Sequence, residues 1–118
     1  YASCGASHPP DDWLDALRPG GRLIFPLTRD DGGGAMLQVE RPVHDNIGTP
    51  PPRYAARFGL PVQFIGCAGL RDALQAERLA RAYANGGLDQ VRSLRRATPS
   101  DASAWWTGAS TWLSTDDA

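Results

Sequence analysis

The run DDWLDALRPGGRLIFPLT, residues 11–28, constrains the fold more than any other part of the chain. Apolar residues at helical spacing follow two acidic residues, and acidic side chains suit the positive end of a helix dipole. The Pro-Gly-Gly at residues 19–21 then ends the helix, because proline cannot continue it and glycine tolerates the left-handed exit. Residues 23–27 are a nearly continuous apolar run without alternation, which predicts a strand covered on both faces, as in a parallel sheet.

A strand of this kind needs partner strands and covering helices, and the length of the chain limits how many it has. With 118 residues the chain forms a single domain, residues 1–118, that is large enough to bury a core. It begins with Tyr1 rather than Met, and residues 1–4 have the composition of the last residues of a strand. We therefore expect a fragment, the C-terminal part of a longer domain.

Charge and cysteine content exclude several classes of function. The 12 basic residues, all arginine, nearly balance 13 acidic ones, so we expect no nucleic-acid or membrane partner. No apolar run approaches the roughly 20 residues needed to span a bilayer, and we expect a cytoplasmic protein. Cys4 and Cys67 stand in no metal-ligand spacing with His8 or His44, so we expect reduced thiols and no metal site.

The rest of the pattern predicts a hairpin, a helix and an aromatic tail. The expected elements are a glycine-rich hairpin loop at 29–34, strands at 35–40 and 54–67 that pair antiparallel, an amphipathic helix at 70–85 and a short strand at 91–94. Gly59 and Pro61 interrupt the second strand and favour a bulge or an edge position. The tail, residues 104–113, holds three tryptophans, which favours aromatic burial against the body over stacking on bases or sugars.

The apolar positions of the helix at 70–85 repeat at intervals of three and four residues, which predicts a face packed on the core. These positions are Ala73, Leu74, Ala76, Leu79, Ala80 and Tyr83. A helix that binds a partner protein is the alternative.

The order of the pieces CGASHPPDDWLDALRPGGRLIFPLT, a hairpin and ARFGLPVQFIGCAG resembles the C-terminal half of the protein-L-isoaspartate O-methyltransferase family. In that family a strand ends in a small-residue segment followed by proline, a helix of the type LxxLxPGGRL and a strand that ends in proline. The match covers residues 1–67, and residues 68–118 resemble the helical, Trp-rich extension of a longer subgroup. The resemblance implies an α/β fold, the C-terminal part of a Rossmann-like class I methyltransferase sheet with a helix–strand crossover, an antiparallel hairpin and a covering helix.

The resemblance also implies a cofactor and a substrate. Family members hold S-adenosylmethionine over a glycine-rich turn after the first strand, with an acidic residue after the second, and these 118 residues contain neither element. The fragment is therefore expected to be inactive alone, with its catalytic residues upstream. The substrate is a protein or peptide with an isoaspartyl or other carboxylate. The substrate-binding residues implied are Gly5, Ala6, Ser7, His8 and Pro26.

Ser7 or His8 is the residue expected to hydrogen-bond the substrate carboxylate, because both lie where a strand of the family meets its substrate. A loop histidine that makes only local contacts is the alternative for His8. At the level of the whole protein, the alternatives are a class I methyltransferase that acts on a small molecule and a non-enzymatic α/β interaction module. An exposed sheet edge would also favour a homodimer.

Overall fold

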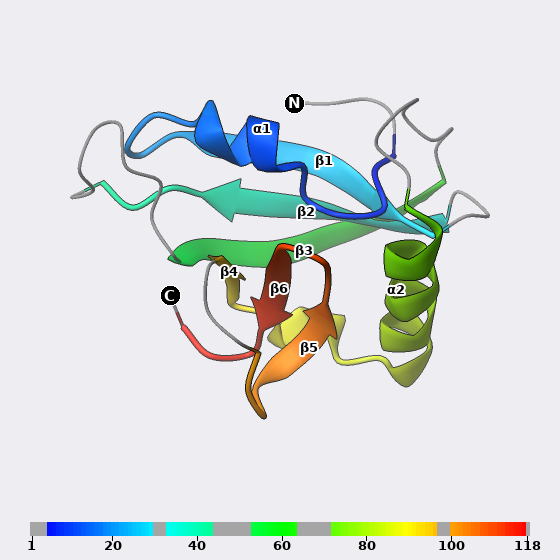
Figure 1. Ribbon diagram of the computed structural model, residues 1–118. Coiled ribbons are helices and arrows are strands. Elements are labelled where there is room, and N and C mark those ends of the chain that lie inside the picture. Colours follow the sequence, from blue (N-terminus) through cyan, green and yellow to red (C-terminus); the bar gives the residue numbers. More distant parts are fainter. Residues whose placement is uncertain (1–4, 30–32, 44–52, 64–71, 97–99, 118) are drawn as a thin grey trace.

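The computed structural model describes residues 5–29, 33–43, 53–63, 72–96 and 100–117 (Figure 1). The described residues form an α/β structure in which one six-stranded sheet of order β1-β2-β3-β4-β6-β5 packs with two α-helices. All neighbouring strands in that sheet pair antiparallel. The elements are α1 (Asp11–Asp15), β1 (Arg22–Thr28), β2 (Gly33–Glu40), β3 (Arg53–Gln63), α2 (Ala73–Asn85), the 3-10 turn η1 (Leu88–Gln90), β4 (Ser93–Arg96), β5 (Ala104–Thr107) and β6 (Thr111–Ser114).

The predicted helix, turn and strand are confirmed. The helix α1 follows Pro10 and carries two acidic residues in its first turn, although it spans only five residues. Gly20 adopts φ 78°, the left-handed conformation that the Pro-Gly-Gly sequence predicts. The amide of Gly20 donates to the carbonyl of Arg41 at 3.0 Å, so the turn is fixed to the segment that follows β2.

β1 has the antiparallel strand β2 on one side and a short parallel contact on the other. Its pairing with β2 runs from Arg22 opposite Glu40 to Thr28 opposite Gly34. The parallel neighbour that its apolar sequence predicts is a single bridge between Ala6 and Leu27. Among the described residues, β1 therefore lies in an antiparallel sheet rather than in the parallel sheet that its apolar run predicts.

β2 and β3 form the hairpin that the sequence predicts. Buried and half-buried residues alternate along β2, as expected for a strand with one face on the core. Leu37 pairs with Phe58 and Ala35 with Pro61, so β3 carries one extra residue between these pairs. The interruption at Gly59 and Pro61 is therefore a β-bulge. Residues 64–67 of the expected strand, and residues 1–4, lie outside the described residues.

α2 ends at Asn85, as predicted, but it begins at Ala73, and residues 70–71 of the expected helix lie outside the described residues. The carboxylate of Asp72 accepts a hydrogen bond from the amide of Gln75 at 2.9 Å, and Gly86 ends the helix with φ 72°. The prediction that Leu74 belongs to the packed face is wrong, because its side chain is 56% exposed. Gln75 is buried instead, and its side-chain oxygen accepts from the amide of Ala109 at 3.1 Å. Ala73 is also exposed, because it begins the helix on the same outer side.

The tryptophan-rich tail is part of the sheet. Trp106 and Trp112 are each 3% exposed, which confirms the predicted aromatic burial. The tail forms the hairpin of β5 and β6, and β6 pairs with β4 so that the C-terminal region extends the same sheet (Figure 1). The indole of Trp112 also lies 5.3 Å from the guanidinium carbon of Arg95, a cation–π contact.

One hydrophobic core joins the two halves of the sheet. Its buried side chains include Phe25, Leu37 and Tyr54 from the first three strands and Leu94 and Leu113 from the last three. Within the part of the chain that the structure describes, no helix is both long enough and apolar enough to cross a membrane.

Candidate functional site at the carboxyl end of β1

The predicted site begins where residues 5 and 6 run beside the last residues of β1. The amide of Ala6 donates to the carbonyl of Pro26 at 3.0 Å, and the amide of Thr28 donates to the carbonyl of Ala6 at 2.9 Å. Ala6 and Leu27 form the parallel bridge. Parallel neighbours need a crossover connection, and here the segment that contains α1 supplies it. We call the junction of residues 5–8 with residues 26–28 the strand-end corner.

The structure brings all five predicted substrate-binding residues into the strand-end corner. Gly5, Ala6, Ser7 and Pro26 are buried, and His8 is half-buried. Gly5 is required for close packing, because an added Cβ would lie 2.2 Å from the side-chain oxygen of Thr28. The corner is therefore compact, and substrate binding by these residues stays a prediction.

Ser7 faces the start of α2. Its Oγ accepts a hydrogen bond from the amide of Asp72 at 2.8 Å and lies 3.0 Å from Nδ1 of His8. The side chain of Asp72 caps the helix, and the hydrogen bond from the Gln75 amide holds the pKa of this carboxyl below its ordinary value. The sequence does not reveal this contact, because Ser7 and Asp72 are 65 residues apart.

Tyr83, near the C-terminal end of α2, makes a second contact between this helix and the corner. Its hydroxyl donates to the carbonyl of Leu27 at 2.6 Å and accepts from the amide of Ala35 at 3.3 Å. Burial raises the pKa of the Tyr83 phenol, although the Ala35 amide and the charge of Arg29 act in the opposite direction. The phenol therefore stays protonated and keeps its role as a donor to β1.

A pocket of about 420 Å³ adjoins the corner beyond the end of β1. The guanidinium carbon of Arg29 lies 5.7 Å from the centre of the Tyr83 ring. That ring also makes edge contacts with Phe58 and Trp105, at centroid distances of 5.8 and 5.5 Å. The lining residues are Arg29, Gly33, Gly34, Ala35, Gly59, Pro61, Tyr83 and Leu88. The sequence analysis did not name Arg29 as a candidate, although Arg29 directly follows a predicted strand and ligands of open α/β sheets bind beyond strand ends.

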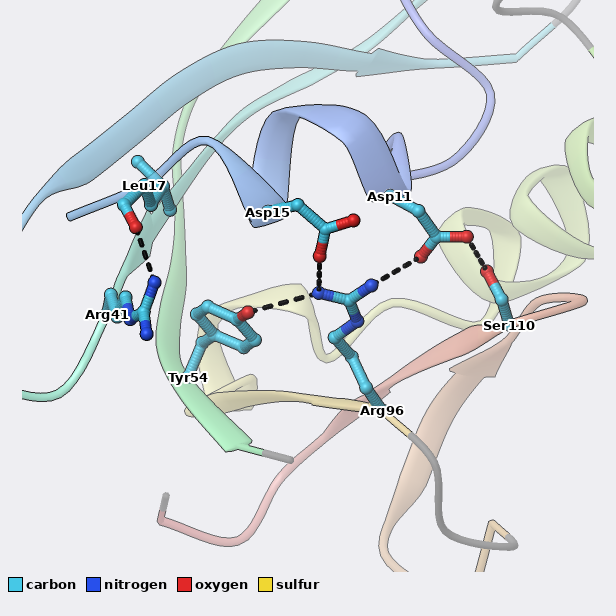
Figure 2. Close-up of polar contacts among 7 residues, drawn as sticks. All are labelled: Asp11, Asp15, Leu17, Arg41, Tyr54, Arg96 and Ser110. Atoms are coloured by element: carbon cyan, nitrogen blue, oxygen red, sulfur yellow. Dashed lines mark hydrogen bonds and ion pairs between the residues drawn. The ribbon is translucent and has the colours of Figure 1, made fainter. Parts of the chain in front are cut away.

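Ion pairs hold the crossover helix α1 against the C-terminal strands. Figure 2 shows Arg96 of β4 between two carboxylates of α1, at 2.8 Å from Asp15 and 3.3 Å from Asp11. The hydroxyl of Tyr54 lies 3.2 Å from the same guanidinium, and Ser110 donates to Asp11 at 2.9 Å. Burial opposes the charge of Arg96, but the bonds to Tyr54 and Asp15 raise its pKa overall, so it stays a cation.

A second contact fixes the exit of α1. The guanidinium of Arg41 donates to the carbonyl of Leu17 at 2.6 Å (Figure 2), and Arg41 is 5% exposed. Together with the Gly20–Arg41 backbone bond, this contact sets the path of the chain from α1 into β1.

The described residues do not fit the cofactor that the resemblance implies. Gly33 and Gly34 belong to β2, which follows a strand in a hairpin, so they form no strand–turn–helix cradle. An added Cβ on Gly34 would lie 2.1 Å from the carbonyl oxygen of Leu27, so this glycine serves strand packing. The described part of the chain also contains no group of three or more His, Cys, Asp or Glu side chains placed to bind a metal ion. Cys4, Cys67 and His44 lie outside it.

Comparison with known proteins adds no relative to this picture. No family model matches the chain, and no curated protein and no solved structure matches it.

Proposed function

We propose that the chain is the substrate-side, C-terminal part of an S-adenosylmethionine-dependent protein carboxyl O-methyltransferase of the isoaspartyl type. The observation that carries this proposal is the parallel bridge between Ala6 and Leu27, formed across the α1 crossover. A strand, a helical crossover and a parallel strand are the repeating unit of a Rossmann-like sheet, and we propose that such a sheet continues beyond Ala6.

The position of the corner supports a ligand-binding role. In open α/β sheets, ligands bind beyond the carboxyl ends of parallel strands. Ser7 and His8 directly follow one strand end of the parallel pair, and Thr28 is the last residue of the other. The predicted residues therefore lie at the edge where a substrate of such a sheet would enter.

We propose that this chain holds the substrate carboxylate that accepts the methyl group. An ionised carboxylate is already a nucleophile, so its methylation needs alignment in a dry site more than acid–base catalysis. Alignment of this kind contributes on the order of 7–11 kcal/mol. The buried Ala6, Ser7 and Pro26 would exclude water, and His8 would contact the substrate.

We further propose that the cofactor is held by residues outside this chain, that the protein acts in the cytoplasm, and that the chain alone is inactive. The edge of β1 before the Ala6 bridge has no strand partner among the described residues. Unpaired edges favour strand exchange, so a homodimer through this edge belongs to the proposal. A strictly monomeric chain at high concentration in light scattering would refute the dimer.

The proposal is tested by isothermal titration of S-adenosylhomocysteine into this chain and into a longer protein that includes the upstream sequence. We expect binding by the longer protein alone, together with methyl transfer to a peptide that contains one isoaspartyl residue. Methylation of a small molecule but of no peptide would identify a different class I methyltransferase. Failure of the longer protein to bind would refute a methyltransferase of any kind and favour the interaction module.

A further inference from the structure

The face of the sheet that lies opposite the core is hollowed across β1, β2 and β3. Three pockets of about 310, 250 and 390 Å³ adjoin one another there, because each shares lining residues with the next. We call this surface the outer groove, and its central residues are Arg22, Ile24, Met36, Gln38, Glu40 and Arg57. We propose that the outer groove binds an acidic amphipathic helix of a partner protein. The groove contains no residue of the strand-end corner, so this inference does not rest on the proposed function.

The outer groove lies on the side of β2 that the described helices do not cover. Leu37 of β2 belongs to the same core cluster as Leu14 of α1 and Leu79 of α2. Buried and half-buried residues alternate along β2, so the half-buried Met36 and Gln38 lie on the opposite face. Both α-helices among the described residues therefore pack on the core face, and the face of Met36 is left to another partner.

Apolar side chains in the groove and at its ends favour such a partner. The apolar run of β1 predicts a strand covered on both faces, and Ile24 of that run lines the 310 Å³ pocket together with Met36. Val43 lines the 390 Å³ pocket at one end and is 66% exposed. Leu60 follows Gly59 of the 310 Å³ pocket at the other end and is 78% exposed. Exposed apolar surface bordered by polar residues is typical of a protein contact site.

The charges of the groove determine the kind of partner. The chain has a net charge of −1, yet its charged groove residues are mostly cations. They are Arg22, Arg41, Arg53, Arg57 and a single acid, Glu40. A second copy of the chain would bring the same arginines against these, so the charges disfavour a dimer through this face. An acidic partner with an apolar stripe complements both the cations and the apolar floor, whereas a nucleic-acid backbone offers the floor no apolar face.

Arg57 is the cation that is most available to this partner. The guanidinium of Arg22 lies 4.0 Å from Glu40, although both side chains are largely exposed and such a pair is weak. Arg53 lies near Asp101, because its charge helps to lower the pKa of that carboxyl. Arg57 is exposed, and within the described ranges it has no ion-pair partner. Arginine in a groove of this kind is a typical centre of binding energy.

The shape of the groove selects a helix over an extended peptide. β2 is paired with β1 on one edge and with β3 on the other, so a partner meets side chains here and cannot join as a strand. A helix satisfies its own backbone hydrogen bonds in this position. Three neighbouring strands span about 10 Å, which is about the diameter of a helix. The eight residues of β2 extend about 27 Å, the length of a helix of about 18 residues.

The test uses the single methionine of the chain, Met36, as the reporter. Its carbon-13-labelled methyl group gives one NMR signal from within the groove. The probe is a peptide of the length given above, with leucine at helical three- and four-residue spacing and glutamate and alanine elsewhere. We expect a saturable shift of the Met36 signal that weakens as the salt concentration rises. An unmoved signal in the unaltered chain overturns the proposal.

Two control peptides separate charge from shape. One replaces every glutamate by lysine, and the other keeps the composition but scrambles the leucine spacing. We expect neither to shift the Met36 signal at concentrations where the first peptide saturates it. An equal response to the lysine peptide overturns the charge complementarity, and an equal response to the scrambled peptide overturns the amphipathic helix.

Arg57→Glu tests the contact itself. The side chain is exposed, so the variant should fold, and we expect it to bind the acidic peptide about tenfold more weakly. The matched control is Arg81→Glu on α2, which makes the same change in net charge at an exposed arginine outside the groove and should leave the affinity nearly unchanged. Equal losses for the two variants would reduce the effect to long-range attraction and overturn the site. Arg57→Gln carries the same test should Arg57→Glu not fold.

Two further titrations examine other occupants. We expect the Met36 signal to be independent of chain concentration without peptide, because a homodimer through the edge of β1 leaves the groove open. A shift that rises with the dimer mass in light scattering would identify a second copy as the occupant and overturn the partner protein. A single-stranded oligonucleotide should leave Met36 unchanged, and a stronger response to it than to the acidic peptide would overturn the proposal in favour of nucleic acid.

Discussion

The two parts of the chain, residues 1–67 and 68–118, use their side chains differently around the strand-end corner. The first part supplies the predicted substrate-binding residues, which are small or buried apart from the half-buried His8, and it supplies the parallel bridge. The second part supplies the groups that hold them in place: the amide of Asp72 on Ser7, the hydroxyl of Tyr83 on β1 and the guanidinium of Arg96 on α1. The C-terminal part is therefore a structural support of the corner, and it continues the same sheet.

The variant with the largest expected effect removes a buried side chain from the second part, and its effect on the first part is then measured. Trp106→Ala removes a buried indole of β5 that also donates to the carbonyl of Gln75 at 3.3 Å. We expect a loss of about 3–5 kcal/mol of unfolding free energy. Because one core joins both parts, urea unfolding should stay a single transition in which the amides of β1 lose their protection together with those of β6.

The control is Trp106→Phe, which keeps an aromatic ring at the position and should cost less. A Trp106→Ala protein in which β2 and β3 keep full hydrogen-exchange protection while β5 and β6 unfold would contradict the single core. The two parts would then be separate folding units, and the support of the corner would be incidental.

Arg96→Met tests the support of α1. The change removes the cation and leaves Asp11 and Asp15 without it, but their side chains are 45% and 48% exposed and regain water. We therefore expect a moderate cost of about 1–2 kcal/mol, below that of a fully buried pair. Hydrogen exchange should accelerate first in α1.

The matched control is Arg81→Met on α2, which breaks an exposed pair with Glu77 at 2.9 Å. Such a pair contributes only about 0.3–0.5 kcal/mol. Equal costs for the two arginines would mean that the cluster in Figure 2 is ordinary surface charge.

Tyr83→Phe isolates one hydrogen-bonded group between the parts. The ring remains among its aromatic neighbours, while the carbonyl of Leu27 loses its donor and the amide of Ala35 its acceptor. We expect a loss of about 1 kcal/mol, the usual size for a hydroxyl of this kind. Exchange of the Ala35 amide should accelerate more than that of Val39, and equal protection would contradict the bridging role of the hydroxyl.

The sequence predicts the first part better than the second, for a physical reason. The helix, turn and hairpin are set by neighbouring residues: proline and glycine at the turn of residues 19–21, and alternation along β2. The strands β5 and β6 have four residues each, too few for a periodic signal, and they form because β4 offers a partner edge. Their apolar content predicted burial but gave no information on pairing.

The candidate site shows the same difference between what neighbouring residues predict and what distant contacts determine. Five residues near the strand ends were implied by the family resemblance, and the structure places them together. The groups that hold the corner were not predicted, because Asp72 and Tyr83 lie 65 and 56 residues from their partners. Leu74 also shows this limit, since three- and four-residue spacing does not decide which of two adjacent faces a sheet will cover.

The smallest expected effect is the acid sensitivity of the contact between the parts at Asp72. The hydrogen bond from the Gln75 amide holds the pKa of this carboxyl below its ordinary value of 3.8. A carboxyl with a depressed folded pKa stabilises the fold fully above its unfolded pKa, and loses that contribution as the pH falls through the lowered value.

Asp72→Asn keeps the capping geometry and the amide that binds Ser7, but it cannot titrate. We therefore expect a shallower fall in urea midpoint for Asp72→Asn than for the unaltered chain between about pH 5 and pH 2. Asp101 is the matched comparison: hydrogen bonds from Ser103 lower its pKa too, but Asp101 precedes β5 rather than the helix whose first residues contact Ser7. Asp101→Asn should flatten the acid curve without altering the hydrogen exchange of the Asp72 amide, which donates to Ser7. If it accelerated that exchange as strongly as Asp72→Asn, support of the corner would extend through the whole second part rather than through Asp72, Tyr83 and Arg96.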